Sequence, residues 1–491
     1  MKQKNYMALD FGVGHGVAML GTFDGERIDL EPMHRFVVRH TSMLGTDYWD
    51  FPGMMIHAKV GLDKYSARYG AHLDGVGVDA WNADFGLLDK TGHLLANPVH
   101  LHDRRTLGAV EKLLATIPDR SLYQRTGIRS RRDGTLFQLF AMAQANSPLL
   151  DKAVTVLLMA DLVSYFLSGT PVQEYTLATT TGMYDAESRD WSRDIILGAK
   201  IPPGMVPEIV APGTVIGSLL DEVAGEVGLG PTPVIAPASH GMAGAIAAVP
   251  AKGDDWLCIS SGYWNQVVAE LPAPIINDAS FTYDFSNLGG VDGSIRLQKE
   301  VMGMGVLDGL VRMWSRQDGR DVPVEEALQL AEATPATGRL VNPDDPRLIE
   351  AQDTPAMLNT LLRELGQGET LDRGEQARMF MDSVVLGLRH VVGQLRELTG
   401  RKYGVIHFVG RGANSPFLAQ AIADATGMVV KAGPVEVKAL GNVLMQMIAL
   451  GDLGSLAEAR ELVGRSCEIP EYTPQNCERW DEEYEKFKKL V

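Results

Sequence analysis

Val-Ile-Ala-Pro-Ala-Ser-His-Gly-Met-Ala-Gly, residues 234–244, joins a short apolar run to a run of small residues. The apolar run predicts a buried strand at Val234–Pro237, and the small residues predict a helix that begins at about Ala243. Ser239 and His240 stand in the turn between the two. A strand that ends in a polar turn before a helix is typical of an α/β fold.

The alternation of strands and helices continues along the chain. Short apolar runs predict further strands at Met7–Asp10, Val17–Thr22, Val76–Asp79, Trp256–Ile259, Trp264–Val268 and Ile406–Val409. Periodicity predicts helices at Asp151–Leu167, Val324–Ala333, Gln376–Thr399, Pro416–Ala425 and Asn442–Leu450, and the charge-rich tail at Trp480–Lys489 predicts a surface helix. We therefore expect α/β layers throughout the chain.

Two hairpin signatures lie far apart in the sequence. Phe11-Gly-Val-Gly-His-Gly16 separates the first pair of strands, and Ser260-Ser-Gly-Tyr263 separates the pair within residues 256–268. The recurrence favours two related halves, although two unrelated hairpins would give the same pattern. The chain of 491 residues is long enough for two cores. We place the boundary after the small-residue helix, with an N-terminal domain at 1–248 and a C-terminal domain at 249–491.

The composition excludes several classes of protein. A net charge of -17 argues against a nucleic-acid binder or a protein of anionic membranes, because either needs a basic surface. Three cysteines, Cys258, Cys467 and Cys477, are too few for a disulfide framework or a zinc knuckle. No run approaches the roughly 20 apolar residues of a membrane helix. The N-terminus also has no apolar signal core, so we expect a cytoplasmic protein.

Glycine-rich turns are candidate phosphate sites because glycine lets backbone amides approach an anion. The first such turn follows Asp10, whose carboxylate can hold Mg²⁺ through water. Another, Gly410-Arg-Gly-Ala-Asn414, stands between a strand and a helix, where a nucleotide can bind. Each turn is also compatible with an ordinary connection. The candidate nucleotide-binding residues are Gly12, Gly14, His15, Ser261, Gly262, Tyr263, Gly410, Arg411, Gly412 and Asn414.

Two polar segments in the N-terminal half suit a sugar, which needs paired hydroxyl contacts and an apolar stacking surface. Residues 77–86 supply Asp79, Trp81, Asn82 and Asp84, and residues 98–106 supply His100, His102 and Asp103. His100 and His102 would share one face of a strand, so with Asp103 they could bind a sugar or a divalent metal. A solvated loop with a packed tryptophan, and histidines that serve only as hydrogen-bonded surface groups, are the simpler interpretations.

The order of these motifs resembles the FGGY family of carbohydrate kinases, and within it the rhamnulokinases, over roughly residues 5 to 450. The segments that carry the resemblance are residues 10–12, 78–89, 97–106, 122–128, 174–180, 236–240, 260–262, 287–290, 295–299, 341–347, 410–414 and 432–436.

The resemblance implies two actin-like (ribonuclease H-like) ATPase domains of α/β class that flank a central cleft. ATP and Mg²⁺ would lie mostly against the second domain, and a ketose-type sugar mostly against the first. The reaction would move the γ-phosphoryl group of ATP to a sugar hydroxyl. The expected partners are a small sugar and a nucleotide, in a monomer or a homodimer. His240 and Asn287 join the expected sugar-binding residues.

The sequence departs from the family pattern where phosphate is handled. The family has an Asp after the His, the general base that takes the hydroxyl proton, and Gly241 stands at that position here. The hairpin turns carry His15 and Tyr263, and Arg411 interrupts the glycines of the adenosine loop. In the sugar region Asn82 and His102 are also unusual. The expected catalytic positions are therefore Asp10, His240 and Gly241, the site of the missing base.

Three functions remain open from the sequence. The first is an active sugar kinase in which His240, His15 or Asp10 replaces the base. The second is a catalytically silent relative that binds a sugar or nucleotide. The third is a metal-dependent sugar enzyme that uses His100, His102 and His240 with Zn²⁺, Mn²⁺ or Co²⁺.

Overall fold

The computed structural model describes residues 3–369 and 372–491. The chain forms two compact units. The first contains residues 1–250, 270–297 and 436–466, and the second contains residues 251–269, 298–435 and 467–491. The sequence places residues 270–297 and 436–466 in the C-terminal domain, whereas in the structure they pack with the N-terminal part of the chain.

The first unit is built on a sheet with the strand order β13-β14-β6-β1-β2-β3. These strands span Thr214–Ser218, Pro233–Ala236, Gly75–Ala80, Lys4–Phe11, His15–Phe23 and Ile28–Val37. β14, β6 and β1 run parallel, and β2 returns antiparallel beside β1. The expected hairpin at residues 11–16 and the expected strand that ends before Ser239 are therefore confirmed.

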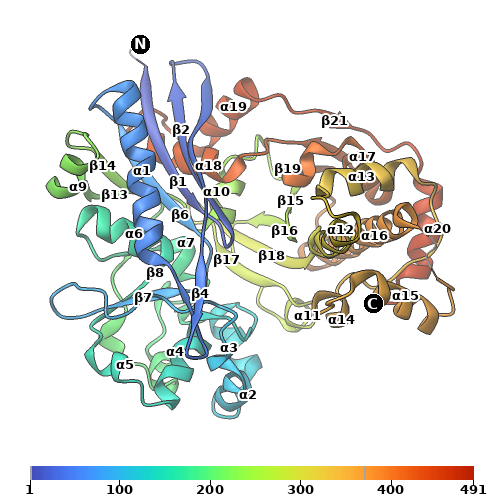
Figure 1. The fold of residues 1–491 in the computed structure, drawn as a ribbon, viewed down its shortest axis with the longest axis horizontal. Helices are drawn as coiled ribbons and strands as arrows, with labels where there is room; N and C mark the ends of the chain where they lie inside the picture. The colour runs from blue at the N-terminus through green and yellow to red at the C-terminus, as the bar shows by residue number, and fades with distance from the viewer. Residues whose placement is uncertain (1–2, 370–371) are drawn as a thin grey trace. The chain divides into compact units, whose positions relative to one another are not determined.

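Alternation along the strands assigns the two faces of this sheet. Met7, Leu9 and Phe11 of β1 pack into a core with α1 (Phe51–Tyr69) and α6 (Met159–Ser168). α1 runs along the sheet in Figure 1. The opposite face meets α18 (Val437–Ala449): a β-carbon at Gly77 would touch Asn442 of that helix. Small residues on this face therefore allow α18 to lie close to the strands.

The second unit repeats this strand order. Its sheet runs β18-β16-β15-β19-β20-β21, over Ile295–Met302, Trp264–Leu271, Trp256–Ser261, Val405–Gly410, Val429–Ala432 and Glu471–Tyr472. β15, β19 and β20 run parallel, and β16 returns antiparallel beside β15. β17 (Ser286–Gly289) and the first residues of β18 belong to the first unit. The two hairpins thus open two sheets of one topology, as their recurrence in the sequence predicts.

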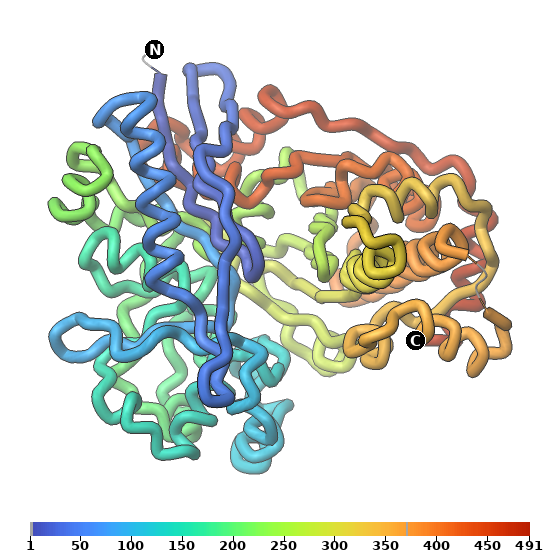
Figure 2. Tube along the Cα trace, in the orientation of Figure 1, coloured from blue at the N-terminus to red at the C-terminus, as the bar shows by residue number. Residues whose placement is uncertain are grey.

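The other helices of the first unit are α2 Ala109–Leu114, α3 Asp119–Thr126, α4 Thr135–Gln144, α5 Pro148–Lys152, α7 Tyr175–Ala178, α8 Arg193–Gly198, α9 Asp221–Glu226, α10 Gly241–Ala247, α11 Asp278–Thr282 and α19 Leu456–Ser466. Those of the second unit are α12 Gly305–Asp318, α13 Val324–Ala333, α14 Pro346–Ile349, α15 Thr354–Glu364, α16 Arg373–Thr399, α17 Pro416–Thr426 and α20 Cys477–Phe487. Figure 2 traces the C-terminal segment with α18 and α19 back to the blue N-terminal strands.

Short strands complete the first unit: β4 His40–Met43, β5 Thr46–Trp49, β7 Phe85–Leu88, β8 Thr155–Leu158, β9 Gln173–Glu174, β10 Tyr184–Asp185, β11 Asp190–Trp191 and β12 Ile209–Val210. β8 corrects one prediction, because residues 151–167 are not a single helix. The apolar run Thr155–Leu158 contains β-branched residues and pairs with β7, so strand pairing prevails over helical periodicity there. α18 also begins at Val437, five residues before the predicted start at Asn442.

The remaining predicted helices are close to the observed ones. α13 spans Val324–Ala333 as predicted, and α16 and α17 extend the predicted ranges by a few residues. α20 holds the charge-rich tail on the second unit, with Trp480 buried. Among the described residues, no helix is long and apolar enough to cross a membrane.

Candidate active site

Two carboxylates lie side by side in the first unit. Asp10 near the end of β1 is the register partner of Asp79 near the end of β6. Paired residues of neighbouring parallel strands point to the same face of a sheet, so both side chains lie on the face that α18 covers. The two carboxyl groups are close enough for each to shift the pKa of the other. The sequence predicted both residues but not that they meet.

The surroundings of this pair supply one donor and one cation. Asn442 of α18 donates a hydrogen bond of 2.7 Å from Nδ2 to Asp79 Oδ2. Asp79 Oδ1 is buried and has no hydrogen-bond partner among the described residues. Burial raises the pKa of Asp79 well above its usual range, and the neighbouring Asp10 raises it further. Burial also raises the pKa of Asp10, while the nearby Lys438 ammonium lowers it.

Gly241 adjoins this carboxylate pair. It is the first residue of α10, and a bridge between Ala80 and His240 joins the preceding turn to the end of β6. A β-carbon at Gly241 would stand 3.3 Å from Asp79 Oδ1 and 3.2 Å from Cδ of Lys438. A carboxylate side chain at residue 241 would therefore emerge beside the Asp79 carboxylate and the aliphatic part of Lys438.

His240 is buried and held in one state. Its Nδ1 lies 2.9 Å from an Nη atom of Arg296, which is itself fully buried. Burial lowers the pKa of His240 well below its usual range, and Arg296 lowers it further. The imidazole is therefore neutral and accepts the Arg296 hydrogen bond at Nδ1, because a guanidinium can only donate. Its Nε2–H is then a donor.

Glu174 fixes the turn before α10. Its carboxylate accepts hydrogen bonds from the backbone N–H groups of Thr176, Leu177 and Ser239. Burial raises the pKa of Glu174 to about 7, and these hydrogen bonds oppose the rise. The hydroxyl of Thr176 in turn accepts the N–H of His240. Glu174 thus positions the His240–Gly241 turn from one side.

Asp84 is the centre of a second buried cluster. Its Oδ2 accepts the indole N–H groups of Trp49 and Trp81, at 2.7 Å and 3.0 Å. Gln138 donates to Oδ1, and burial raises the pKa of Asp84 to about 6. This predicted sugar-binding residue therefore uses both oxygens to hold the cluster together. Asn82, which precedes it, is exposed.

The expected imidazole set is only partly assembled. The ring centroids of His100 and His102 lie 5.3 Å apart, and the N–H of His102 donates to Nδ1 of His100. Burial lowers the pKa of His100 to about 4. Asp103 accepts from the backbone N–H groups of Asp47 and Arg105. Within the described part of the chain, no group of three or more His, Cys, Asp or Glu side chains could hold a metal ion.

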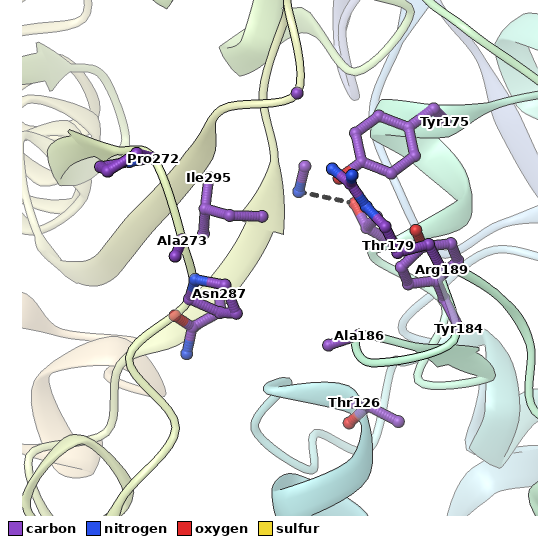
Figure 3. A pocket seen from close by; sticks show the side chains of 13 residues that line it. Thr126, Tyr175, Thr179, Tyr184, Ala186, Arg189, Pro272, Ala273, Asn287 and Ile295 are labelled. Carbon is purple, nitrogen blue, oxygen red and sulfur yellow. Dashed lines mark hydrogen bonds between the residues drawn. The ribbon is translucent and has the colours of Figure 1, made fainter.

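A cavity of about 240 Å³ opens elsewhere in the first unit, and Figure 3 shows its lining. Asn287, a predicted sugar-binding residue, stands in the wall. Both polar atoms of its amide are already bonded to the backbone of Ile275. Arg296 connects this wall to the His240–Gly241 turn, since its Nε donates to the carbonyl of Gly289 and one Nη donates to His240 Nδ1.

The predicted phosphate loops of the second unit come together at the ends of β15 and β19. Ser261 is the register partner of Gly410, and a β-carbon at Gly412 would overlap Oγ of Ser261. Gly410 has a φ of 79°, which favours glycine at that turn. The chain continues through a 3-10 turn at Arg411–Asn414.

Tyr263 has a clear structural partner in the same unit. A β-carbon at Gly305 would stand 2.7 Å from the Tyr263 ring, so the ring lies directly on the start of α12. Backbone N–H groups of Met304 and Gly305 bond to the carbonyls of Gly262 and Tyr263. The other predicted turn residues, Gly12, Gly14 and His15, belong to the first unit, where the N–H of Gly12 donates to the carbonyl of His15.

Comparison with known proteins identifies this arrangement. The N-terminal and C-terminal domain models of the FGGY family of carbohydrate kinases match residues 64–247 and 257–450. The chain belongs to this family. It is therefore an ATP-dependent sugar kinase, a transferase. A rhamnulokinase from Bacteroides thetaiotaomicron is 34% identical over 491 residues, which cover 100% of both proteins.

Solved structures of FGGY-type kinases share the fold. A xylulose kinase from Rhodospirillum rubrum matches with a TM-score of 0.81 at 20% identity, over 100% of this chain and 98% of that one. A gluconate kinase from Lactobacillus acidophilus matches with a TM-score of 0.80 at 16% identity, over 100% and 96%. The predicted α/β class with two actin-like domains is thus confirmed.

Three residues around the site were not predicted as functional. Lys438 lies in Gly433–Asn442, a glycine-lined turn between a strand and a helix that could receive a nucleotide, but the sequence assigns no role to the lysine itself. Asn442 was expected to open a helix, but it is buried inside α18 and bonds to Asp79. Arg296 stands among apolar neighbours in Ile295–Leu297, which was a usable signal for a buried cation.

Proposed function

We propose that this FGGY kinase transfers the γ-phosphoryl group of Mg-ATP to a hydroxyl of a ketose-type sugar, with Asp79 as the proton acceptor in place of residue 241. One observation carries the proposal: Asp79 Oδ1 has no partner among the described residues and lies 3.3 Å from the place of a β-carbon at Gly241. A buried acceptor without a donor calls for an explanation in a native structure.

The other substitutes for the base have less support. His240 is neutral and already accepts a hydrogen bond at Nδ1, so its free nitrogen carries a proton. His15 is exposed at the start of β2. Asp10 is the better candidate for the cation, since Mg²⁺ prefers carboxylate oxygens and keeps several of its waters.

Asp10 is the residue that would hold a hydrated Mg²⁺ ion, because this ion prefers carboxylate oxygens and keeps several waters. When present, the ion neutralises charge on the transferring group. The chain contributes positioning around it. Asn442 holds Asp79, Glu174 holds the turn at Gly241, and the Lys438 side chain approaches the same place.

In the proposed step, one bond to phosphorus forms while another breaks. The sugar hydroxyl oxygen forms a bond to the γ-phosphorus of ATP, and the bond from that phosphorus to the bridging oxygen of ADP breaks. The hydroxyl proton passes to Asp79 Oδ1. Because phosphoryl transfer has a loose transition state, positioning and charge stabilisation matter more than the strength of the base.

Four variants test the proposal in an assay of ADP release with Mg-ATP and a panel of ketoses. Asp79→Asn should lower kcat by about 10²–10⁴, which is typical for the loss of a general base. The double variant Asp79→Asn/Gly241→Asp should have a kcat at least about tenfold higher than that of Asp79→Asn alone, because the new carboxylate emerges beside residue 79. Gly241→Asp alone should stay active, and Asp10→Ala should be inactive.

The alternatives give different results. A silent relative would show a higher Tm with Mg-ATP but no ADP release with any ketose. If the wild type releases ADP and the Asp79→Asn variant keeps nearly full activity, the protein is a kinase but Asp79 is not its base. Failure of Gly241→Asp to rescue Asp79→Asn would also count against a shared role of the two positions.

A further inference from the structure

The cavity shown in Figure 3 has an unusual balance of polar groups. Thirteen residues line it, and none of them is acidic. Proline, alanine, glycine and isoleucine form much of the wall, including Pro272, Ala273 and Ile295. Arg189 is the single charged side chain of the lining. A cationic cavity is notable in a protein with a net charge of -17.

Three of the polar lining residues are already engaged. Thr126 Oγ1 donates to the carbonyl of Leu122 and accepts the N–H of Ile128. Thr179 Oγ1 donates to the carbonyl of Thr176 and accepts the N–H of Gly289, the bond drawn as a dashed line in Figure 3. The Asn287 amide is bonded to the backbone of Ile275. These groups offer a ligand little hydrogen-bonding capacity.

Arg189 and two phenols supply the remaining polar atoms. The Arg189 side chain lies beside Tyr175 and Tyr184 in the lining, and the rings of these two tyrosines meet edge to face at 5.7 Å. A guanidinium carries five N–H donors and no acceptor, so donors remain for a ligand. The side chains lie together on one wall of the cavity in Figure 3.

Two carboxylates near Arg189 in sequence have other partners. Asp185 pairs with Arg125 at 2.6 Å, and Asp190 accepts the N–H of Trp191. Asp185 also accepts the N–H groups of Glu187 and Ser188, which fixes the turn before Arg189. The guanidinium therefore faces the cavity without a carboxylate in the lining to balance it.

Arg189 also occupies a backbone position that suits glycine. Its φ is 58°, in the left-handed region that non-glycine residues adopt at a cost. Such positions persist where the surroundings impose them, and they cluster at functional sites. Here the strained residue is the one that brings the charge into the cavity.

We propose that this cavity binds the carboxylate group of a small organic anion through Arg189 and Tyr175. Planar guanidinium groups match carboxylates with two parallel hydrogen bonds. A volume of about 240 Å³ equals about eight water volumes of ~30 Å³ each, enough for a molecule rather than a single ion. The proposal rests on the lining of this cavity and does not depend on the role of Asp79.

The carboxylate has two possible sources, a carboxylated sugar substrate or a separate ligand. Calorimetric titration of the full chain with matched pairs tests the shared chemistry: D-gluconate against D-glucitol, and D-glucuronate against D-glucose. At least one acid should bind the wild type about tenfold or more tightly than its neutral partner. Turnover of that acid with Mg-ATP would identify it as a substrate, and binding without turnover as a separate ligand. Either result supports the proposal.

Arg189→Gly is the decisive variant because glycine suits the backbone there. Its Tm should equal or exceed that of the wild type, while the preference for the acid should disappear. Arg189→Lys keeps the positive charge but not the planar guanidinium, so it should retain part of the preference for the acid over its neutral partner. The proposal is overturned if no acid binds the wild type, if acid and neutral partner bind equally, or if a well-folded Arg189→Gly variant keeps the preference.

Discussion

Glu174 is a buried residue whose charge state makes a testable contribution to stability. Burial raises its pKa from 4.5 to about 7, so folding favours the protonated form. The unfolded chain ionises first as the pH rises, and the free energy of unfolding falls between about pH 4.5 and 7. At 1.36 kcal/mol per pKa unit, the fall is about 3 kcal/mol over the full window.

Glu174→Gln should remove this part of the pH dependence. As the pH rises from 5.5 to 8, the free energy of unfolding of the variant should increase by about 2 kcal/mol relative to that of the wild type. Urea unfolding followed by circular dichroism measures this difference. Glu222→Gln, an exposed position on α9, makes the same charge change and serves as the control. Parallel pH curves for wild type and Glu174→Gln would contradict the prediction.

Single residues show what the sequence could and could not predict about the site. Asp10 and Asp79 each follow an apolar strand, so the pattern placed them at strand ends. Their meeting depends on the parallel register of β1 and β6, which no local pattern encodes. Asn287 illustrates the reverse case: its amide is suited to a sugar, but the backbone of Ile275 occupies it.

At the scale of elements, the close approach of α10 and α18 positions Gly241 beside Lys438. A β-carbon at Gly441 of α18 would overlap the carbonyl oxygen of Gly244 in α10. Gly441→Ala should therefore force the helices apart and destabilise the protein by about 1–3 kcal/mol or more. It should also reduce kinase activity, because the same helices carry the site.

Gly393→Ala is the matched control for this helix pair. Gly393 lies inside α16 and is exposed, and a β-carbon there would have nothing within 4 Å of it. Alanine at this position should stabilise by about 0.5–1 kcal/mol, the usual difference from glycine within a helix. Thermal unfolding of both variants checks the prediction, and a neutral Gly441→Ala would show that the backbones need not approach so closely.

Strand pairing also explains why the single helix predicted at residues 151–167 is wrong. Helical spacing continues through Thr155–Leu158, yet these residues form β8 because β7 offers a partner strand. The two hairpins were easier to predict, since a glycine-rich turn between apolar runs is a local signal. A local signal is most informative where the partner strand lies close in the sequence, as in these hairpins.

At the scale of the whole molecule, neither unit is one continuous segment. The first unit takes α18 and α19 from residues 436–466, and it takes β17 with the first residues of β18 from residues 270–297. The sequence places a single boundary after the small-residue helix, because no local pattern indicates that the chain returns to the first unit. Gln446 of α18 donates to the carbonyl of Met7, and Asn442 donates to Asp79.

A fragment of residues 1–248 should therefore fail to fold on its own. Without α18, the face of the sheet that carries Gly77, Asp10 and Asp79 would lose the helix that covers it. Buried apolar surface and the partner of Asp79 would both be lost, and a stable core would not form. We expect the purified fragment to show no cooperative thermal transition by circular dichroism, whereas the full chain measured in parallel unfolds cooperatively. A fragment that melts cooperatively would mean that residues 436–466 attach to a sheet that is already stable, and the return of the chain would then serve to complete the site rather than the fold.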